Sequence, residues 1–196
     1  MKNYKKNLNL LVQNHIYSNE MEHDACGVGL IASTEGKKSR MVVDYGIEAL
    51  KAVWHRGAVD ADGKTGDGAG IHLEIPKDFF IEKIQVTGHD YDNSEICVGM
   101  IFLPRNDYSS QESSKTIVES ELTKSNFNIF GWRQVPVNPK VLGEKAFQTM
   151  PEIIQVLFKS NDSNLLNKDL ERKIYETRKK IEIKADNLSL NDFYVC

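Results

Sequence analysis

The pattern of apolar and polar residues predicts several β-strands along the chain. Residues 96–103 form a continuous apolar run, which is typical of a central strand buried on both faces. Residues 28–32 also predict a buried strand. Residues 71–75 alternate between apolar and polar side chains, as expected for a half-buried strand. Residues 128–137 are predicted to be extended.

Apolar residues at helical spacing predict three helices between these segments. The first covers residues 43–54 and is expected to stop at Gly57, and the second covers residues 110–125. The third has many charged residues opposite its apolar side, which we interpret as a solvated face. Its apolar residues are Leu166, Leu170, Ile174 and Ile181. This alternation of helices and strands predicts a mixed α/β or α+β domain.

The last residues, 193–196, begin a further apolar strand at the point where the sequence stops. A domain rarely ends inside a core strand. We therefore expect the chain to be a C-terminally incomplete fragment of a domain.

Composition and charge narrow the class of protein. The chain has 196 residues, of which 25 are basic and 28 acidic, with a formal net charge of -3. These values fit one ordinary globular domain and argue against a nucleic-acid-binding protein, which would usually have a basic excess. The apolar runs are too short to span a membrane. The cysteines are Cys26, Cys97 and Cys196 without a C-x-x-C pair, which indicates a reducing, cytoplasmic setting.

Glycine is concentrated in one part of the sequence. Nine of the thirteen glycines lie between Asp24 and Gly70. Because glycine permits positive φ angles and close backbone approach, this density indicates tight loops around a site. Turn-rich packing without a site is the alternative interpretation.

Cys26 lies inside this glycine-rich region and is a candidate nucleophile. A thiol needs a base to become the reactive thiolate, and His23 and His55 are candidates. Cleavage between Ala25 and Cys26 would create another base, because an α-amine has a pKa of about 7.7–8.0. A buried, inert cysteine remains the alternative. Cys26 with His23 and His55 makes a weak zinc set, since no second close pair of ligands accompanies it.

Several motifs carry a resemblance to a known family. The sequence around Cys26, the His55-Arg56-Gly57 triplet and the TGDGAG stretch at residues 65–70 resemble the N-terminal region of glutamate synthase large chains. The combination at these separations is specific, although each motif alone would be weak. The likeness extends through most of the chain after about residue 20. Its segments are residues 22–32, 54–58, 61–71, 131–136, 150–151 and 193–195.

The resemblance implies a class II glutamine amidotransferase domain with the N-terminal nucleophile hydrolase fold. That fold is an α+β, four-layer αββα sandwich. Residues 1–25 would be a propeptide, and residues 26–196 part of the amidotransferase domain. After removal of the propeptide, Cys26 would become the N-terminal residue and the nucleophile that attacks the side-chain amide of L-glutamine. A γ-glutamyl thioester would form and ammonia would leave, with the α-amine of Cys26 relaying protons.

The resemblance also implies a substrate-binding set. Arg56 matches the arginine that holds the substrate α-carboxylate, for which a guanidinium group is well suited. Gly57, Asp67 and Gly68 match residues near the glutamine pocket, with Asp67 either lining the pocket or fixing the loop. The glycine-rich stretch lacks the Lys-Ser/Thr ending of a phosphate-binding loop.

The implied partners are L-glutamine, a synthase domain of the same parent chain that transfers ammonia to 2-oxoglutarate, and a small reductase subunit. We expect no cofactor or metal in this segment, and FMN and an iron–sulfur cluster in the missing synthase region. The family's oxyanion-hole Asn-Gly pair has no match before Cys196. Two alternatives therefore stay open: an inactive fragment serving as a glutamine-binding or interaction module, and an amidohydrolase of another substrate. Arg56, which would select an α-carboxylate, argues against the second.

Overall fold

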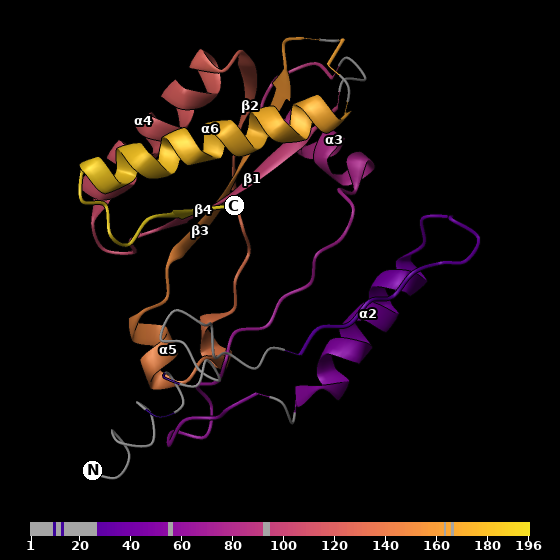
Figure 1. Cartoon of the computed structure of the whole chain (residues 1–196), viewed down its shortest axis with the longest axis vertical. Coiled ribbons are helices and arrows are strands. Elements are labelled where there is room, and N and C mark those ends of the chain that lie inside the picture. The colour runs from indigo at the N-terminus through magenta and orange to yellow at the C-terminus, as the bar shows by residue number, and fades with distance from the viewer. Residues whose placement is uncertain are drawn as a thin grey trace. The chain divides into compact units, whose positions relative to one another are not determined.

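The computed structural model describes residues 10, 13, 27–54, 57–91, 95–162, 164–165 and 167–196. The chain divides into two units, residues 1–58 with 67–71 and residues 59–66 with 72–196. The helices and strands follow one another as shown in Figure 1. They are α2 (Arg40–Ala52), α3 (Lys77–Val86), β1 (Cys97–Leu103), α4 (Tyr108–Lys124), β2 (Phe127–Gln134), η2 (Pro139–Val141), α5 (Glu144–Gln148), β3 (Glu152–Ser160), α6 (Asn167–Asn187) and β4 (Tyr194–Val195).

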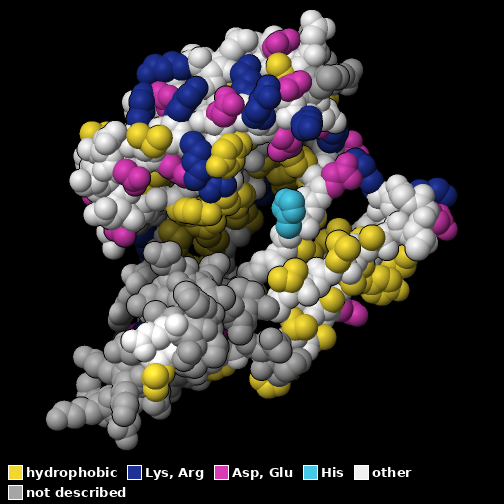
Figure 2. All heavy atoms as spheres, in the orientation of Figure 1, with side chains coloured by type: hydrophobic (Ala, Val, Ile, Leu, Met, Phe, Trp, Pro, Cys, Tyr) yellow, Lys and Arg dark blue, Asp and Glu magenta, His cyan; other side chains and the backbone are white. Residues whose placement is uncertain are grey.

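The first unit contains α2, as the helical spacing predicted. The hydroxyl of Ser39 accepts a hydrogen bond from the amide of Met41 and caps the helix. No residue of α2 is buried, and Tyr45 is exposed. Hydrophobic side chains are visible on the surface of this part of the chain in Figure 2. The apolar spacing therefore predicted the helix correctly, but these side chains form no buried core.

The strand predicted over residues 28–32 is wrong. Residues 27–33 have no regular secondary structure, and Val28 and Leu30 are 94% and 89% exposed. A strand is stable only when a neighbouring strand accepts and donates its backbone hydrogen bonds. No described strand pairs with this segment, so its apolar residues alone do not make it a strand.

The second unit is built on a four-stranded antiparallel sheet in the order β2-β3-β1-β4. The apolar run at residues 96–103 is confirmed as an interior strand, since β1 lies between β3 and β4. Cys97 is opposite Phe158 at one end of the β1·β3 ladder, and Leu103 is opposite Glu152 at the other. The apolar segment at the C-terminus is confirmed as β4, which pairs with β1 at Ile101 and Phe102.

Different helices cover the two faces of this sheet, and each face has its own hydrophobic core. α4 and α6 pack on one face, where Ile101, Val156 and Ile181 belong to the larger hydrophobic core. On the other face, Phe80 and Ile84 of α3 pack with Leu157 in a smaller core. The α+β class is thus confirmed, with an antiparallel sheet and helices on both faces. The described residues supply one of the two sheets expected of a four-layer sandwich.

The strand predicted over residues 71–75 is also wrong. Ile71 and Leu73 are 44% and 42% exposed, and the segment has no strand partner among the described residues. Pro76, which was expected to end a strand, is instead the N-cap of α3, a helix that the sequence pattern did not predict. Because proline has a fixed φ and no amide proton, it fits the start of a helix as well as the end of a strand.

β2 contributes to both cores and contains a β-bulge. Alternation along the strand puts Ile129 against the larger core and Phe130 in the smaller one. The register with β3 shifts between Ile129 and Gly131, and this shift returns Trp132 to the side of the larger core. Gly131 has a φ of 147°, and a Cβ there would lie 3.1 Å from the Cγ2 of Thr87. The Thr87 hydroxyl donates to the Phe130 carbonyl at 3.1 Å. Glycine therefore allows the C-terminal end of α3 to dock at the bulge.

Replacing Gly99 with alanine is expected to lower the free energy of unfolding by about 1–3 kcal/mol. A Cβ there would lie 2.8 Å from the Cγ1 of Val156, which is only 1% exposed and surrounded by core residues. Urea denaturation would measure the loss. In the control Gly70→Ala, a Cβ would have no atom within 4 Å, so a change below about 0.5 kcal/mol is expected. Equal effects of the two substitutions would contradict the close approach.

Replacing Glu121 with glutamine is expected to destabilise the contact between α4 and α6 by about 1–2 kcal/mol at pH 7. The Glu121 side chain is 6% exposed, and it pairs with Lys184 of α6 and with Lys124 at 3.2 Å. The hydrogen bond from Lys184, followed by that from Lys124, lowers the pKa of Glu121 against the opposing effect of desolvation.

A carboxyl group with a lowered folded-state pKa stabilises the protein above its unfolded pKa, about 4.3, and loses this effect as pH falls through the folded pKa. The difference between wild type and Glu121→Gln should therefore shrink in acid. Glu112→Gln is the control, because Glu112 is 74% exposed and pairs with Lys115 on the surface. A difference that is independent of pH would contradict the role of the charged pair.

Candidate functional site

The structure describes only part of the predicted site. Cys26, Arg56 and the two candidate bases His23 and His55 lie outside the described residues. Gly57, Asp67 and Gly68 lie within them, all in the first unit. The roles assigned to Cys26 and Arg56 therefore stay predictions, and the geometry below concerns the loop residues.

Gly57 closes the turn that follows α2. Its amide donates to the carbonyl of Trp54 at 3.0 Å, and a Cβ at Gly57 would lie 3.4 Å from that oxygen. This is ordinary van der Waals distance, so the turn itself leaves room for a small side chain. The helix thus ends at Ala52, close to the predicted stop, and the HRG motif begins three residues later in the sequence.

Asp67 ties the two sides of the glycine-rich segment together. One oxygen of its carboxylate accepts a hydrogen bond from the Ala58 amide at 2.9 Å. The Asp67 amide donates to the Ala58 carbonyl at 3.2 Å. The Asp67 side chain therefore fixes the loop, because it holds Asp67 against Ala58, the residue that follows the HRG motif.

Gly68 is not required by packing. A Cβ built there would meet no atom of the described residues within 4 Å, and its φ is not in the left-handed region. The described part of the chain therefore leaves open space beside the backbone of Gly68.

The segment between Ala58 and Asp67 belongs to the second unit and forms a tight turn. Val59 pairs with Gly66 in an antiparallel bridge, and the Asp60 amide donates to the Thr65 carbonyl at 2.7 Å. The carboxylate of Asp62 accepts hydrogen bonds from the Thr65 hydroxyl at 2.6 Å and from the amides of Thr65 and Lys64. These bonds, led by that of the Thr65 hydroxyl, hold the pKa of Asp62 well below its usual range. Sequence reasoning did not single out Asp62, although Asp is common in turns because its side chain accepts hydrogen bonds from the backbone of nearby residues.

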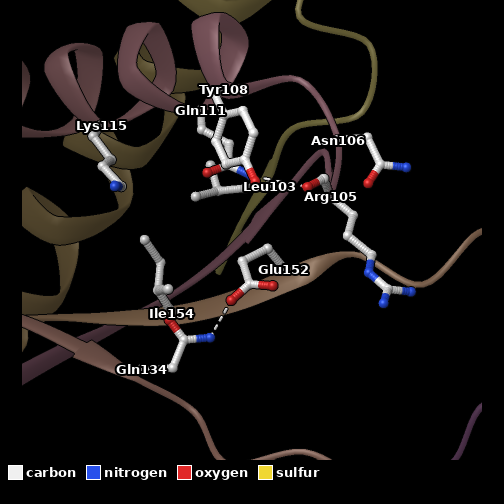
Figure 3. Close-up of a pocket in the computed structure, with 9 residues that line it drawn as sticks. All are labelled: Leu103, Arg105, Asn106, Tyr108, Gln111, Lys115, Gln134, Glu152 and Ile154. Carbon is white, nitrogen blue, oxygen red and sulfur yellow. Dashed lines mark hydrogen bonds between the residues drawn. The ribbon is translucent and has the colours of Figure 1, made fainter. Parts of the chain in front are cut away.

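A cavity of about 370 Å³ lies at one end of the sheet in the second unit (Figure 3). Gln134 donates a hydrogen bond to Glu152 across its floor, and the side chains of Lys115 and Tyr108 border it. None of Gly57, Asp67 and Gly68 lines this cavity. The residues that line it all belong to the second unit.

Cys97 is confirmed as a core residue. It is 5% exposed in β1, and burial raises the pKa of its thiol to about 12. A thiol with this pKa is almost wholly protonated near pH 7 and is a poor nucleophile. Cys196 is exposed. Among the described cysteines, Cys97 is thus excluded as the reactive residue.

Over the residues that the structure describes, no three or more His, Cys, Asp or Glu side chains gather in a way that could hold a metal ion. Nor does any helix in this part have the length and apolar content needed to cross a membrane.

Comparison with known proteins identifies the family. The model of the class II glutamine amidotransferases matches residues 26–196. The chain belongs to this family. The match starts at Cys26 and includes the HRG and TGDGAG motifs, and the resemblance inferred from those motifs is confirmed.

Similar proteins are glutamate synthases. The chain is 48% identical over 193 residues to the large chain of the NADPH glutamate synthase of Azospirillum brasilense, covering 98% of this chain and 13% of that protein. It is 39% identical over 186 residues to the ferredoxin-dependent glutamate synthase of Pyropia yezoensis, which covers 92% of this chain and 12% of that protein. It is 37% identical over 178 residues to the chloroplastic ferredoxin-dependent glutamate synthase of Spinacia oleracea, which covers 89% of this chain and 11% of that protein. The chain thus spans roughly an eighth of the length of these relatives.

Proposed function

We propose that this chain is the glutaminase portion of a glutamate synthase, with Cys26 as its nucleophile. The observation that carries the proposal is the family match over residues 26–196, which begins at the cysteine singled out from the sequence. The relatives named glutamate synthase support the parent activity. In this proposal residues 1–25 are removed and Cys26 becomes the first residue of an amidotransferase domain.

The proposed reaction needs one nucleophile and one base, and Cys26 supplies both. Its neutral α-amine takes the thiol proton, and the sulfur attacks the side-chain amide carbon of L-glutamine. The C–N bond then breaks, and the protonated amine returns its proton to the leaving nitrogen, so that ammonia departs from a γ-glutamyl thioester. The amine next takes a proton from water, which attacks the thioester. Glutamate leaves, and the thiol is restored.

Substrate selection is assigned to Arg56 and the loop that follows it. The guanidinium group of Arg56 would bind the α-carboxylate of glutamine through two parallel hydrogen bonds. Gly57 and Gly68 would let the backbone approach the substrate closely. The hydrogen bond between Asp67 and Ala58 supports a loop-fixing role for Asp67 beside them.

The partner domain and its cofactors are proposed from the relatives alone. Ammonia would pass to a synthase domain of the same parent chain, which would add it to 2-oxoglutarate with electrons carried by FMN and an iron–sulfur cluster and delivered with a small reductase subunit. The present residues do not fit such a cluster, which needs four cysteine ligands in its usual form. The chain has three cysteines, one of them buried in β1. No step of the glutaminase reaction uses these cofactors.

A glutamine-like electrophile tests the proposal directly. Incubation of the chain with 6-diazo-5-oxo-L-norleucine, followed by peptide mass spectrometry, is expected to give one adduct at Cys26 and none at Cys97. Iodoacetamide is the reactivity control, since exposed Cys196 should react with it under native conditions whereas Cys97 should not. Absence of the adduct at Cys26 would contradict the proposed function.

A further inference from the structure

Asp62 reaches out of its own turn to a helix far along the chain. Its carboxylate accepts a hydrogen bond at 3.0 Å from the amide of Glu144, 82 residues later. Glu144 is the first residue of α5, whose N-cap is Gly143. Since glycine has no side chain to cap the helix, the carboxylate of Asp62 does what an N-cap side chain would normally do.

The surroundings of Gly143 are built for this contact. A Cβ at Gly143 would overlap the hydroxyl and amide of Thr65 and the carboxylate of Asp62. Only a residue without a side chain lets the two backbones come this close. Lys145 of α5 also pairs with the carboxylate of Asp60. Residues 60–65 are therefore attached to the start of α5 by a capping hydrogen bond and an ion pair.

We propose that Asp62 is a positioning residue of the glutamine site, because it fixes residues 60–65 on α5 and the chain continues from there through Gly66 into Asp67 and Gly68. The inference rests on the proposed function, because it assigns Gly68 and its neighbours to the substrate. Asp62 itself does not touch the reacting atoms. It acts through the covalent continuity of the loop, whose other end is held by the bond between Asp67 and Ala58.

The chemistry of the contact requires a carboxylate. One oxygen of Asp62 accepts from two amides, and the other accepts from the Thr65 hydroxyl and the Glu144 amide. A carboxylate is an acceptor at both oxygens, whereas the amide of asparagine accepts at only one. In Asp62→Asn, one pair of donors must lose its acceptor. The turn or the attachment to α5 is then lost.

The test compares inactivation kinetics of the full chain and its variants with 6-diazo-5-oxo-L-norleucine. For Asp62→Asn, the reagent concentration giving half-maximal inactivation should rise about 3- to 10-fold, the effect of losing one or two hydrogen bonds. The rate constant at saturation should stay within about twofold, and so should the rate of Cys26 alkylation by iodoacetamide. A general loss of structure would change all three quantities.

Thr65 provides a matched pair of variants that disturb the fold less. Thr65→Ser keeps the hydroxyl that donates to Asp62, so its half-maximal reagent concentration should match that of wild type. Thr65→Val removes the hydroxyl, so its half-maximal concentration should rise, as expected for Asp62→Asn. Hydrogen exchange of the Glu144 amide should accelerate in Asp62→Asn, as expected for loss of its acceptor.

The outcomes separate the two proposals. An adduct at Cys26 with an unchanged half-maximal concentration in Asp62→Asn and Thr65→Val would overturn the positioning role and leave the proposed function standing. A wild-type chain without any adduct would contradict the proposed function, and the positioning role would fall with it. Unchanged exchange at Glu144 would refute the capping contact itself.

Discussion

Replacing Cys26 with serine is expected to abolish both reaction with the glutamine analogue and glutamine hydrolysis. Loss of a covalent nucleophile lowers the turnover of other enzymes by about 10⁴-fold or more, and a similar loss is expected here. Serine keeps the size of the side chain, but its hydroxyl is far less acidic than a thiol. The α-amine could therefore no longer produce the reactive anion in a useful amount.

The control for this substitution is Cys196→Ser. Cys196 is exposed and has no proposed part in the reaction, so adduct formation and ammonia release should match those of wild type. Substantial activity in Cys26→Ser, or equal losses in both variants, would contradict the assignment of the nucleophile. An ammonia assay and intact-mass measurement provide the two readouts.

Replacing Arg56 with lysine is expected to give the second largest effect. Lysine keeps the positive charge but cannot make two parallel hydrogen bonds to a carboxylate. Losing one charge-assisted hydrogen bond should raise the half-maximal concentration of 6-diazo-5-oxo-L-norleucine about 10- to 100-fold. Alkylation of Cys26 by iodoacetamide, which has no α-carboxylate, should continue at the wild-type rate.

Arg105→Lys is the matched control for this experiment. The guanidinium of Arg105 lies 4.8 Å from the ring centroid of Phe147 and lines the cavity of the second unit, and Arg105 has no proposed part in glutamine binding. Its replacement should leave the half-maximal concentration unchanged. If Arg56→Lys and Arg105→Lys behaved alike, Arg56 would not be the carboxylate-binding residue.

The strand β1 and the helix α6 could be predicted because their signals are local. The apolar run of β1 is long enough to exclude an exposed segment, and the apolar side of α6 repeats at helical spacing. Leu170 and Ile181 from that pattern are buried in the larger core. In these elements the hydrophobic pattern and the final burial agree.

The incorrect predictions have a common physical cause. Residues 28–32 and 71–75 carry strand-like patterns, but a pattern gives a preference for one conformation and no hydrogen-bonding partner. In both segments the described chain lacks the pairing strand. The helix α3 was missed for a related reason, because Pro76 is compatible with both an ended strand and a starting helix.

The candidate site was predictable in its motifs and not in its contacts. The cysteine, the HRG triplet and the TGDGAG stretch are contiguous in sequence and led to the family. The attachment of Asp62 to Glu144 joins residues 82 positions apart, and the bulge at Phe130 depends on how β2 meets β3 and Thr87. Such features arise from tertiary packing between residues far apart in the sequence, so local sequence patterns do not predict them.

The proposed mechanism depends most directly on the identity of the first residue of the mature chain. Mass spectrometry of the N-terminal peptide, with the protein purified from cells, measures this. The account predicts that residues 1–25 are missing and that the chain starts with Cys26, whose free α-amine then serves as the base. An N-terminus that still carries residues 1–25, in a protein that hydrolyses glutamine, would contradict it.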